Sequence, residues 1–201
     1  MQFSFNSTTK LLENLQNSGI NEEILLQLIQ HIKSITLKPN QLLLKAGQIN
    51  THLYYVLAGG FVCRFVSGDG EVKRTINFYL NELHPVMACI DSYFSQTKTQ
   101  CELKAIAKST VLAIPKTELD KILNLDDKFK TLYDNLLTRA LIEENDLKLK
   151  IISSKPDELY QYILREFAVV VQKVPSKYIA ELMGISAEWL SKLKSKQRFI
   201  S

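Results

Sequence analysis

The chain has 201 residues, of which 46% are hydrophobic and 23% charged, with three cysteines and a formal net charge of +4. This length suits one sensor-sized domain plus a small one, and the apolar content can bury a core, which excludes disordered, collagen-like and disulfide-stapled chains. No run approaches the roughly 18 apolar residues of a membrane span, and the N-terminus lacks a signal-peptide pattern. We therefore expect a cytoplasmic protein with no membrane partner.

The first third of the chain changes from a helical to a β pattern. Leucine and isoleucine recur at helical spacing over residues 8–33, which predicts two short amphipathic helices separated near Gly19. From Ile35 onward, short β-like runs alternate with turns roughly every ten residues, a rhythm typical of an antiparallel sandwich or barrel. The predicted strands cover residues 41–45, 53–57, 61–66, 72–79, 101–107 and 110–114.

Cysteines and histidines show no pattern of a metal site. Cys63, Cys89 and Cys101 are an odd number at wide spacing, so we interpret them as buried free thiols. The three histidines are scattered over separate elements, and no metal is expected. The sequence also lacks a nucleophile with its base, or a carboxylate pair, at readable spacing, and therefore predicts no enzyme.

After Pro115 the helical period returns, over 116–123 and then over a long run that reaches Ile151. The apolar residues of this run are Phe129, Leu132, Tyr133, Leu136, Leu137, Ala140, Leu141, Leu147 and Ile151. A small domain cannot cover a helix of roughly six turns on every side, so we expect residues 125–152 to pair with a second copy of the chain. The alternative is a helix that lies along its own β-domain.

A break at Ser153–Asp157 marks the predicted start of the last domain. Pro156 suits the first turn of a new helix that runs to about Phe167, and Val169–Val174 predicts a short strand. We therefore divide the chain into a sensor domain (1–124), a dimerisation helix (125–152) and a C-terminal domain (153–201).

Residues 176–196 have the pattern of a helix-turn-helix. Gly184 allows the tight turn, Ser186 caps the second helix, and Glu188 lies in its first turn, where the helix dipole favours a negative charge. An ordinary pair of antiparallel helices is the alternative. The predicted inner faces consist of Ile179, Ala180, Met183, Leu190 and Leu193.

The positive charge of the chain is concentrated in the same segment. Residues 173–201 hold six basic and two acidic side chains, and the rest of the chain is neutral. Either a nucleic-acid surface or a solvated lysine-rich tail explains this charge. If the second helix enters the major groove, the predicted base-reading residues are Ala187, Glu188, Ser191 and Lys192. The predicted phosphate-binding residues are Ser176, Lys177, Lys194, Lys196 and Arg198, and Trp189 is expected to be partly buried.

The order of these parts resembles the Crp/Fnr family of bacterial transcription regulators over nearly the whole chain. The matching segments are residues 42–47, 53–62, 105–115 and 179–192. The resemblance implies an α+β fold: an N-terminal antiparallel β-roll of the cupin-like, cyclic-nucleotide-binding type with flanking helices, a long dimerisation helix, and a C-terminal winged helix-turn-helix. It also implies a homodimer that binds a palindromic site in double-stranded DNA, with RNA polymerase as a further partner. Where the family commonly has an arginine before the glutamate, this chain has Ala187.

The expected effector site departs from the family pattern. Members that bind cyclic AMP hold its phosphate with a Gly-Glu helix start and an Arg-Ser pair, whereas this chain has Val86–Cys89 and Thr99–Cys101 at the corresponding positions. We therefore expect no cyclic AMP binding in the family manner and no cofactor, although Lys98 or Lys104 could supply a point charge. The degenerate effector pocket is expected at Gly59, Gly60, Met87, Ala88, Thr99 and Gln100.

These observations predict a sequence-specific, DNA-binding transcription regulator with an unknown effector. The alternative is an effector-binding or protein-interaction subunit that keeps the roll but does not bind DNA specifically. The charge distribution favours the regulator, because such a subunit has no reason to gather positive charge on the second helix.

Overall fold

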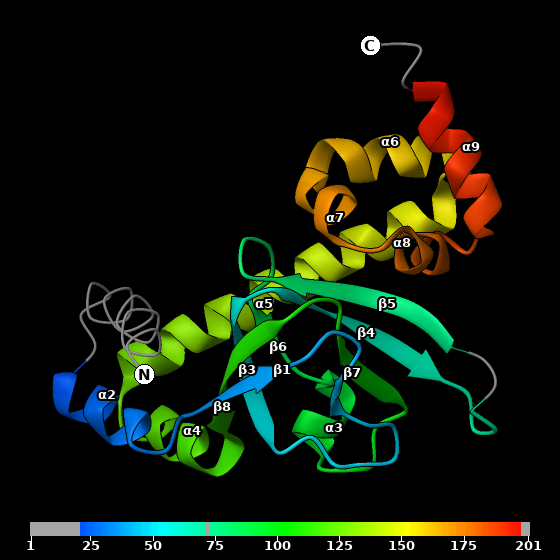
Figure 1. Cartoon of the computed structure of the whole chain (residues 1–201). Coiled ribbons are helices and arrows are strands. Elements are labelled where there is room, and N and C mark those ends of the chain that lie inside the picture. The colour runs from blue at the N-terminus through cyan, green and yellow to red at the C-terminus, as the bar shows by residue number, and fades with distance from the viewer. Residues whose placement is uncertain (1–20, 71–72, 198–201) are drawn as a thin grey trace.

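The computed structural model describes residues 21–70 and 73–197. The first helix predicted within 8–33 and the predicted phosphate ligand Arg198 lie outside these residues. The described part consists of two antiparallel sheets, a long helix that runs past them, and a group of helices at the far end of that long helix (Figure 1). Across the described ranges, no helix combines the length and the apolar character that a bilayer crossing requires.

Two four-stranded sheets form the β-roll. The first sheet has the order β1-β8-β3-β6, with β1 (Lys33–Leu37), β3 (His52–Ala58), β6 (Val86–Met87) and β8 (Ser109–Pro115). The second has the order β2-β7-β4-β5, with β2 (Leu42–Leu44), β4 (Gly60–Val66), β5 (Lys73–Leu80) and β7 (Cys101–Ala105). All pairings are antiparallel, which confirms the predicted architecture, although β1 and the two-residue β6 were not predicted.

The second sheet separates two apolar cores. Successive side chains of a strand point to opposite faces, so Phe61 and Cys63 of β4 enter the core of the roll. Val62, between them, packs on the other side against the C-terminal helices, together with Phe78 and Leu80 of β5. The C-terminal domain therefore rests on the outer face of this sheet.

The hairpin between β3 and β4 requires two glycines. Gly59 has a φ of +76°, and a Cβ there would lie 2.6 Å from the carbonyl oxygen of Lys108. A Cβ on Gly60 would collide with the side chain of Leu80. The close approach of Lys108 to Gly59 and of β5 to Gly60 explains the Gly-Gly pair.

Helices close one end of the roll. The helix α2 (Glu22–Ile29), α4 (Lys116–Leu123) and the start of α5 (Asp127–Ser153) share a core that includes Leu25, Leu119 and Phe129. The short α3 (Ile90–Ser95) follows β6. Asp126 caps the start of α5, and its carboxylate accepts a hydrogen bond of 2.8 Å from the Phe129 amide.

The long helix predicted over 125–152 is α5, and its apolar residues face two ways. Leu132 and Tyr133 pack against the helices at the end of the roll, and Ile151 packs against the C-terminal core. The face of α5 that carries Leu132, Tyr133 and Ile151 therefore packs against its own chain, as the alternative prediction stated. Four other apolar side chains are 54–75% exposed and lie on a different face, which we call the α5 stripe: Leu141, Ile142, Leu149 and Ile152.

The C-terminal domain is helical throughout its described residues. Helices α6 (Pro156–Glu166), α7 (Ala168–Lys173), α8 (Ser176–Met183) and α9 (Ala187–Gln197) follow one another. The strand predicted at Val169–Val174 is wrong: α7 covers this segment as far as Lys173, and Val170 in the helix and Val174 directly after it are both buried. A lone strand would leave its backbone groups unpaired, whereas a helix pairs them internally. The predicted wing has no strand within residues 153–197.

Candidate nucleic-acid interface

Helices α8 and α9 form the helix-turn-helix that the sequence predicts. Gly184 ends α8 with φ 66° and ψ 26°, and the amide of Ile185 donates to the Ala180 carbonyl at 3.1 Å, which closes the turn. A Cβ on Gly184 would meet no atom within 4 Å. The glycine is therefore required for its left-handed backbone and not for lack of space.

The predicted inner faces of both helices are buried. Apolar positions recur three and four residues apart on each helix, which brings them onto one side. The exposed fractions are Ile179 0%, Ala180 3%, Met183 7%, Leu190 0% and Leu193 3%. This core fixes the crossing of the two helices and therefore determines which face of α9 is turned outward.

The start of α9 is capped as predicted. The hydroxyl of Ser186 accepts a hydrogen bond of 3.1 Å from the amide of Trp189. Hydrogen bonds from the Glu188 backbone and then from Ser186 lower the pKa of the Glu188 carboxyl below its usual value. Glu188 is thus a carboxylate at neutral pH and acts as an acceptor at the helix N-terminus.

We expect Ser186→Ala to lower the stability of the C-terminal domain by about 1 kcal/mol, because the Trp189 amide loses its acceptor. Urea unfolding followed by circular dichroism measures this change. The matched control is Ser195→Ala, since the Ser195 hydroxyl bonds the Ser191 carbonyl within the helix and alanine favours a helix interior. An equal loss in both variants would contradict the cap.

The four predicted base-reading residues share one exposed face of α9. Residues 187, 188, 191 and 192 are one helical turn apart in pairs, and all four are exposed, opposite the buried Leu190 and Leu193. Trp189 is 47% exposed, so its indole is half covered, as expected. The face combines a cation, a carboxylate, a hydroxyl and a methyl group, which together can contact every type of base edge in a major groove.

The predicted phosphate ligands flank this face from both helices. Lys194 of α9 donates to the hydroxyl of Ser176 at the start of α8, at 2.6 Å, so these two residues form one site. The ammonium of Lys177 lies 4.7 Å from the centre of the Tyr178 ring. Lys196 is 71% exposed and 3.9 Å from Asp157, a pair that screening makes weak. None of these four side chains is buried, and their role toward phosphates stays a prediction.

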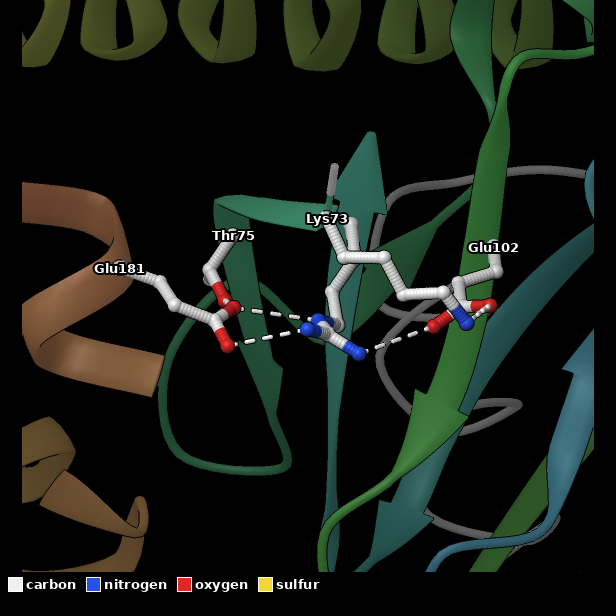
Figure 2. Close-up of polar contacts among 5 residues, drawn as sticks. Lys73, Thr75, Glu102 and Glu181 are labelled. Atoms are coloured by element: carbon white, nitrogen blue, oxygen red, sulfur yellow. Dashed lines mark hydrogen bonds and ion pairs between the residues drawn. The ribbon is translucent and has the colours of Figure 1, made fainter. Parts of the chain in front are cut away.

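A network of charged groups, which we call the clamp, joins α8 to the roll. The guanidinium of Arg64 on β4 bonds both carboxylate oxygens of Glu181 on α8, at 3.1 and 2.9 Å, and donates to Glu102 on β7 at 3.1 Å. The hydroxyl of Thr75 donates to Glu181 at 2.7 Å, and Lys73 lies 3.4 Å from Glu102. Figure 2 shows Thr75 beside Glu181 and Lys73 beside Glu102, at the two ends of this network.

The clamp is nearly buried and holds the domain in one orientation. The side chains of Arg64, Glu102 and Glu181 are 12%, 6% and 24% exposed, and Arg64 also lies 5.4 Å from the centre of the Tyr178 ring. A bidentate pair fixes direction as well as distance. The clamp therefore turns one side of α8 toward the roll and leaves the exposed face of α9 free.

Sequence reasoning missed the clamp. Arg64 and Glu181 are 117 residues apart, and each is an unremarkable charged residue in its own segment. The alternation along β4 indicates only that Arg64 points away from the residues that enter the roll core. No local signal pairs the two side chains.

The residues of the expected effector pocket are mostly packed. Met87, Ala88 and Thr99 are 0–3% exposed, while Gln100 is exposed. The hydroxyl of Thr99 accepts from the Cys101 amide at 2.9 Å. Gly59 and Gly60 have a structural reason in the hairpin, as described above. Their role toward an effector stays a prediction.

A scan against models of protein families finds no match, and neither does a search of curated proteins. Solved structures do match. FixK2 from Bradyrhizobium japonicum has a TM-score of 0.67 at 15% identity, covering 84% of this chain and 85% of its own. A Crp/Fnr family regulator from Eubacterium rectale scores 0.67 at 13% identity, with 90% and 85% coverage. The c-di-GMP responsive regulator CLP from Xanthomonas campestris scores 0.65 at 13%, with 89% and 92%. The chain has the fold of these Crp/Fnr regulators.

Proposed function

We propose that this protein is a sequence-specific, DNA-binding transcription regulator of the Crp/Fnr type that acts as a homodimer. The observation that carries the proposal is the exposed face of α9, where Glu188, Ser191 and Lys192 lie together on a helix whose opposite face is buried. The predicted phosphate ligands Ser176 of α8 and Lys194 of α9 meet beside that face. The fold shared with known regulators supports the same reading. RNA polymerase is the partner that a regulator of this type implies.

The α5 stripe supports the dimer. Four exposed apolar side chains on one helix face are costly in water, and a second copy of α5 would cover them. Two α9 helices related by a two-fold axis would then meet successive major grooves, about one DNA turn apart. The expected DNA site is therefore palindromic.

We further propose that cyclic AMP is not the effector. The segments where the phosphate would bind hold Met87, Ala88 and Thr99, which are packed and carry neither a carboxylate nor a guanidinium. A cyclic phosphate at this place would lack charge-assisted hydrogen bonds.

Selection from a randomised DNA duplex pool tests these proposals, at two salt concentrations and with or without cyclic AMP. We expect enrichment of a palindrome that is the same in both nucleotide conditions. Weak, salt-sensitive binding without enrichment would overturn the regulator and favour an interaction subunit that has kept the roll. A palindrome enriched only with cyclic AMP would overturn the second proposal alone.

We expect Lys192→Ala and Lys196→Ala to weaken DNA binding in different ways. Lys192 lies on the base-reading face, so its loss should cost about 1–3 kcal/mol on the selected site and little on others. Lys196 lies beside that face, so its loss should weaken all sequences alike and reduce the salt slope by about one. Titration of both variants on matched and mutated duplexes measures this. Equal losses on every sequence for both variants would contradict the assigned roles.

A further inference from the structure

The three cysteines of the chain meet inside the roll, in what we call the thiol cluster. Cys101 on β7 lies opposite Phe65 on β4, and Cys63 is two residues before Phe65, so both thiols are on the same face of neighbouring strands. Cys89 follows β6 of the opposite sheet. All three contact one apolar core, although 26 and 12 residues separate them along the chain.

The thiols of the cluster differ in exposure and in charge. Cys63 and Cys89 are 3% and 2% exposed, whereas Cys101 is only partly buried. Hydrogen bonds from Cys63, Cys89 and the Thr99 hydroxyl stabilise a thiolate at Cys101 and lower the pKa of that thiol. The contact with Cys101, followed by burial, raises the pKa values of Cys63 and Cys89. The least buried of the three cysteines is therefore also the one whose environment favours the thiolate, and two buried thiols share its core.

We propose that Cys101 is the reactive thiol of a hydroperoxide-sensitive site in the roll, and that its oxidised form is joined to Cys89 by an intramolecular disulfide. The site lies next to Ala88 and Gln100, where an effector pocket was expected. The roll would then respond to a hydroperoxide that oxidises Cys101 instead of to a bound nucleotide.

The geometry favours Cys89 over Cys63 as the second thiol. Diagonal positions on neighbouring antiparallel strands have Cα atoms about 7–8 Å apart, beyond the usual disulfide limit of about 7 Å. Cys63 and Cys101 stand in this diagonal relation. Cys89 follows a strand of the facing sheet and packs into the same core, so no strand register holds it apart from Cys101.

The chemistry is a balanced two-electron exchange. The Cys101 thiolate attacks the terminal oxygen of a hydroperoxide; the S–O bond forms, the O–O bond breaks, and the leaving alkoxide takes up a proton. The Cys89 sulfur then attacks the Cys101 sulfur, the S–S bond forms, and hydroxide leaves with the Cys89 proton as water. Two thiols and one hydroperoxide thus give a disulfide, an alcohol and water.

The thiol cluster is directly connected to the clamp. Cys101 precedes Glu102, and Cys63 precedes Arg64, so the two groups lie on opposite faces of the same strands. A disulfide that pulls β7 toward the facing sheet would shift Glu102 relative to Arg64 and loosen the hold on Glu181. That this loosening would regulate DNA binding rests on the proposed function. The thiol chemistry itself does not, because it requires no DNA.

Peptide mapping by mass spectrometry tests the proposal on the full chain, treated with hydrogen peroxide in the presence of a metal chelator. We expect a Cys89–Cys101 linked peptide in the monomer fraction, and alkylation of Cys101 at least about tenfold faster than of Cys63 before oxidation. Equal alkylation rates, or oxidation of Cys101 only to sulfinic acid, would overturn the proposal. Both the linked peptide and the alkylation rates are measured on the wild-type protein, so the test does not depend on the folding of a variant.

Three single variants test the role of each cysteine separately, and circular dichroism checks that each variant folds. Cys89→Ala should stop at the sulfenic acid, which dimedone traps, and Cys101→Ala should abolish the reaction. Cys63→Ala is the matched control and should still form the disulfide. A Cys63–Cys101 link in the wild type would refute the assignment of Cys89.

Hydrogen exchange tests the connection to the clamp. In the oxidised protein we expect the amides of β5 and α8 to exchange about tenfold faster, with α2 and α4 unchanged. Unchanged exchange at α8 would overturn the connection and leave the thiol chemistry standing. Because neither measurement contains DNA, failure here is distinct from failure of the proposed DNA binding.

Discussion

Replacing Arg64 with alanine should lower the free energy of unfolding by about 3–5 kcal/mol, the largest effect we expect from a single side chain. Arg64 lies between the carboxylates of Glu102 and Glu181, which are 6% and 24% exposed. Among the residues that the structure describes, its loss leaves the Glu181 carboxylate with the Thr75 hydroxyl alone and removes the neutralising charge between two acidic groups. An uncompensated buried charge costs far more than the pair itself contributes.

Urea unfolding followed by circular dichroism measures this loss, and we expect the C-terminal helices to separate from the roll first, as a distinct transition. The matched control is Arg139→Ala: Arg139 also pairs with a glutamate, Glu143, at 2.8 Å, but its side chain is 79% exposed. That variant should change stability by no more than about 0.5 kcal/mol. Similar small losses in both would show that the clamp is a surface feature.

A double variant separates the charge from the packing. Arg64→Met with Glu181→Leu removes this ion pair and leaves apolar groups of similar volume, while Glu102 keeps Lys73 at 3.4 Å, so part of the lost stability should return. Recovery would show that Arg64→Ala destabilises through the stranded carboxylate. In the double variant the C-terminal helices should still separate from the roll first, because the bidentate contact that orients α8 is absent.

The second large effect is expected from Leu141→Asp in the α5 stripe. Leu141 is 72% exposed, so in a monomer this change would cost almost nothing. In a dimer it buries a carboxylate in the apolar contact between two α5 helices and should drive the protein to a monomer. Two linked DNA-binding domains bind more tightly than one by a factor of 10² to 10⁴, so we expect affinity for the palindrome to fall at least about 100-fold.

Sedimentation of the free protein and titration of the palindrome measure the two parts of this prediction. Ala140→Asp is the matched control: Ala140 is also exposed, but it lies seven residues before Leu147, which faces its own chain. It should leave the dimer intact. A wild-type protein that sediments as a monomer would contradict the dimer outright.

Local patterns predicted most of the elements. The alternation along β4 and β5 and the turns between runs indicated the roll, because strand period and turn chemistry are properties of short segments. The same holds for the helix-turn-helix, where Gly184 has the left-handed backbone that the turn requires. The roles of the predicted DNA-contacting residues, by contrast, stay predictions.

The prediction of secondary structure was wrong where the surroundings of a segment outweighed its intrinsic β propensity. The valines of 169–171 favour a strand, yet no neighbouring strand is present within residues 153–197 to pair with them, and α7 forms instead. In the long helix, too, the sequence alone does not show which apolar residues are buried. Its sequence combines two apolar faces, and only the folded chain separates the residues that pack inward, such as Ile151, from the exposed Leu141 and Ile152.

By itself, the sequence determined the roll, the long helix, the helix-turn-helix and the face of α9 that is turned outward. These depend on contacts between residues a few positions apart, or on a repeating period. Only the tertiary structure decided that Arg64 meets Glu181 and that three distant cysteines share one core. Such pairs are created when strands from different parts of the chain become neighbours, and a side chain carries no local mark of a partner more than a hundred residues away.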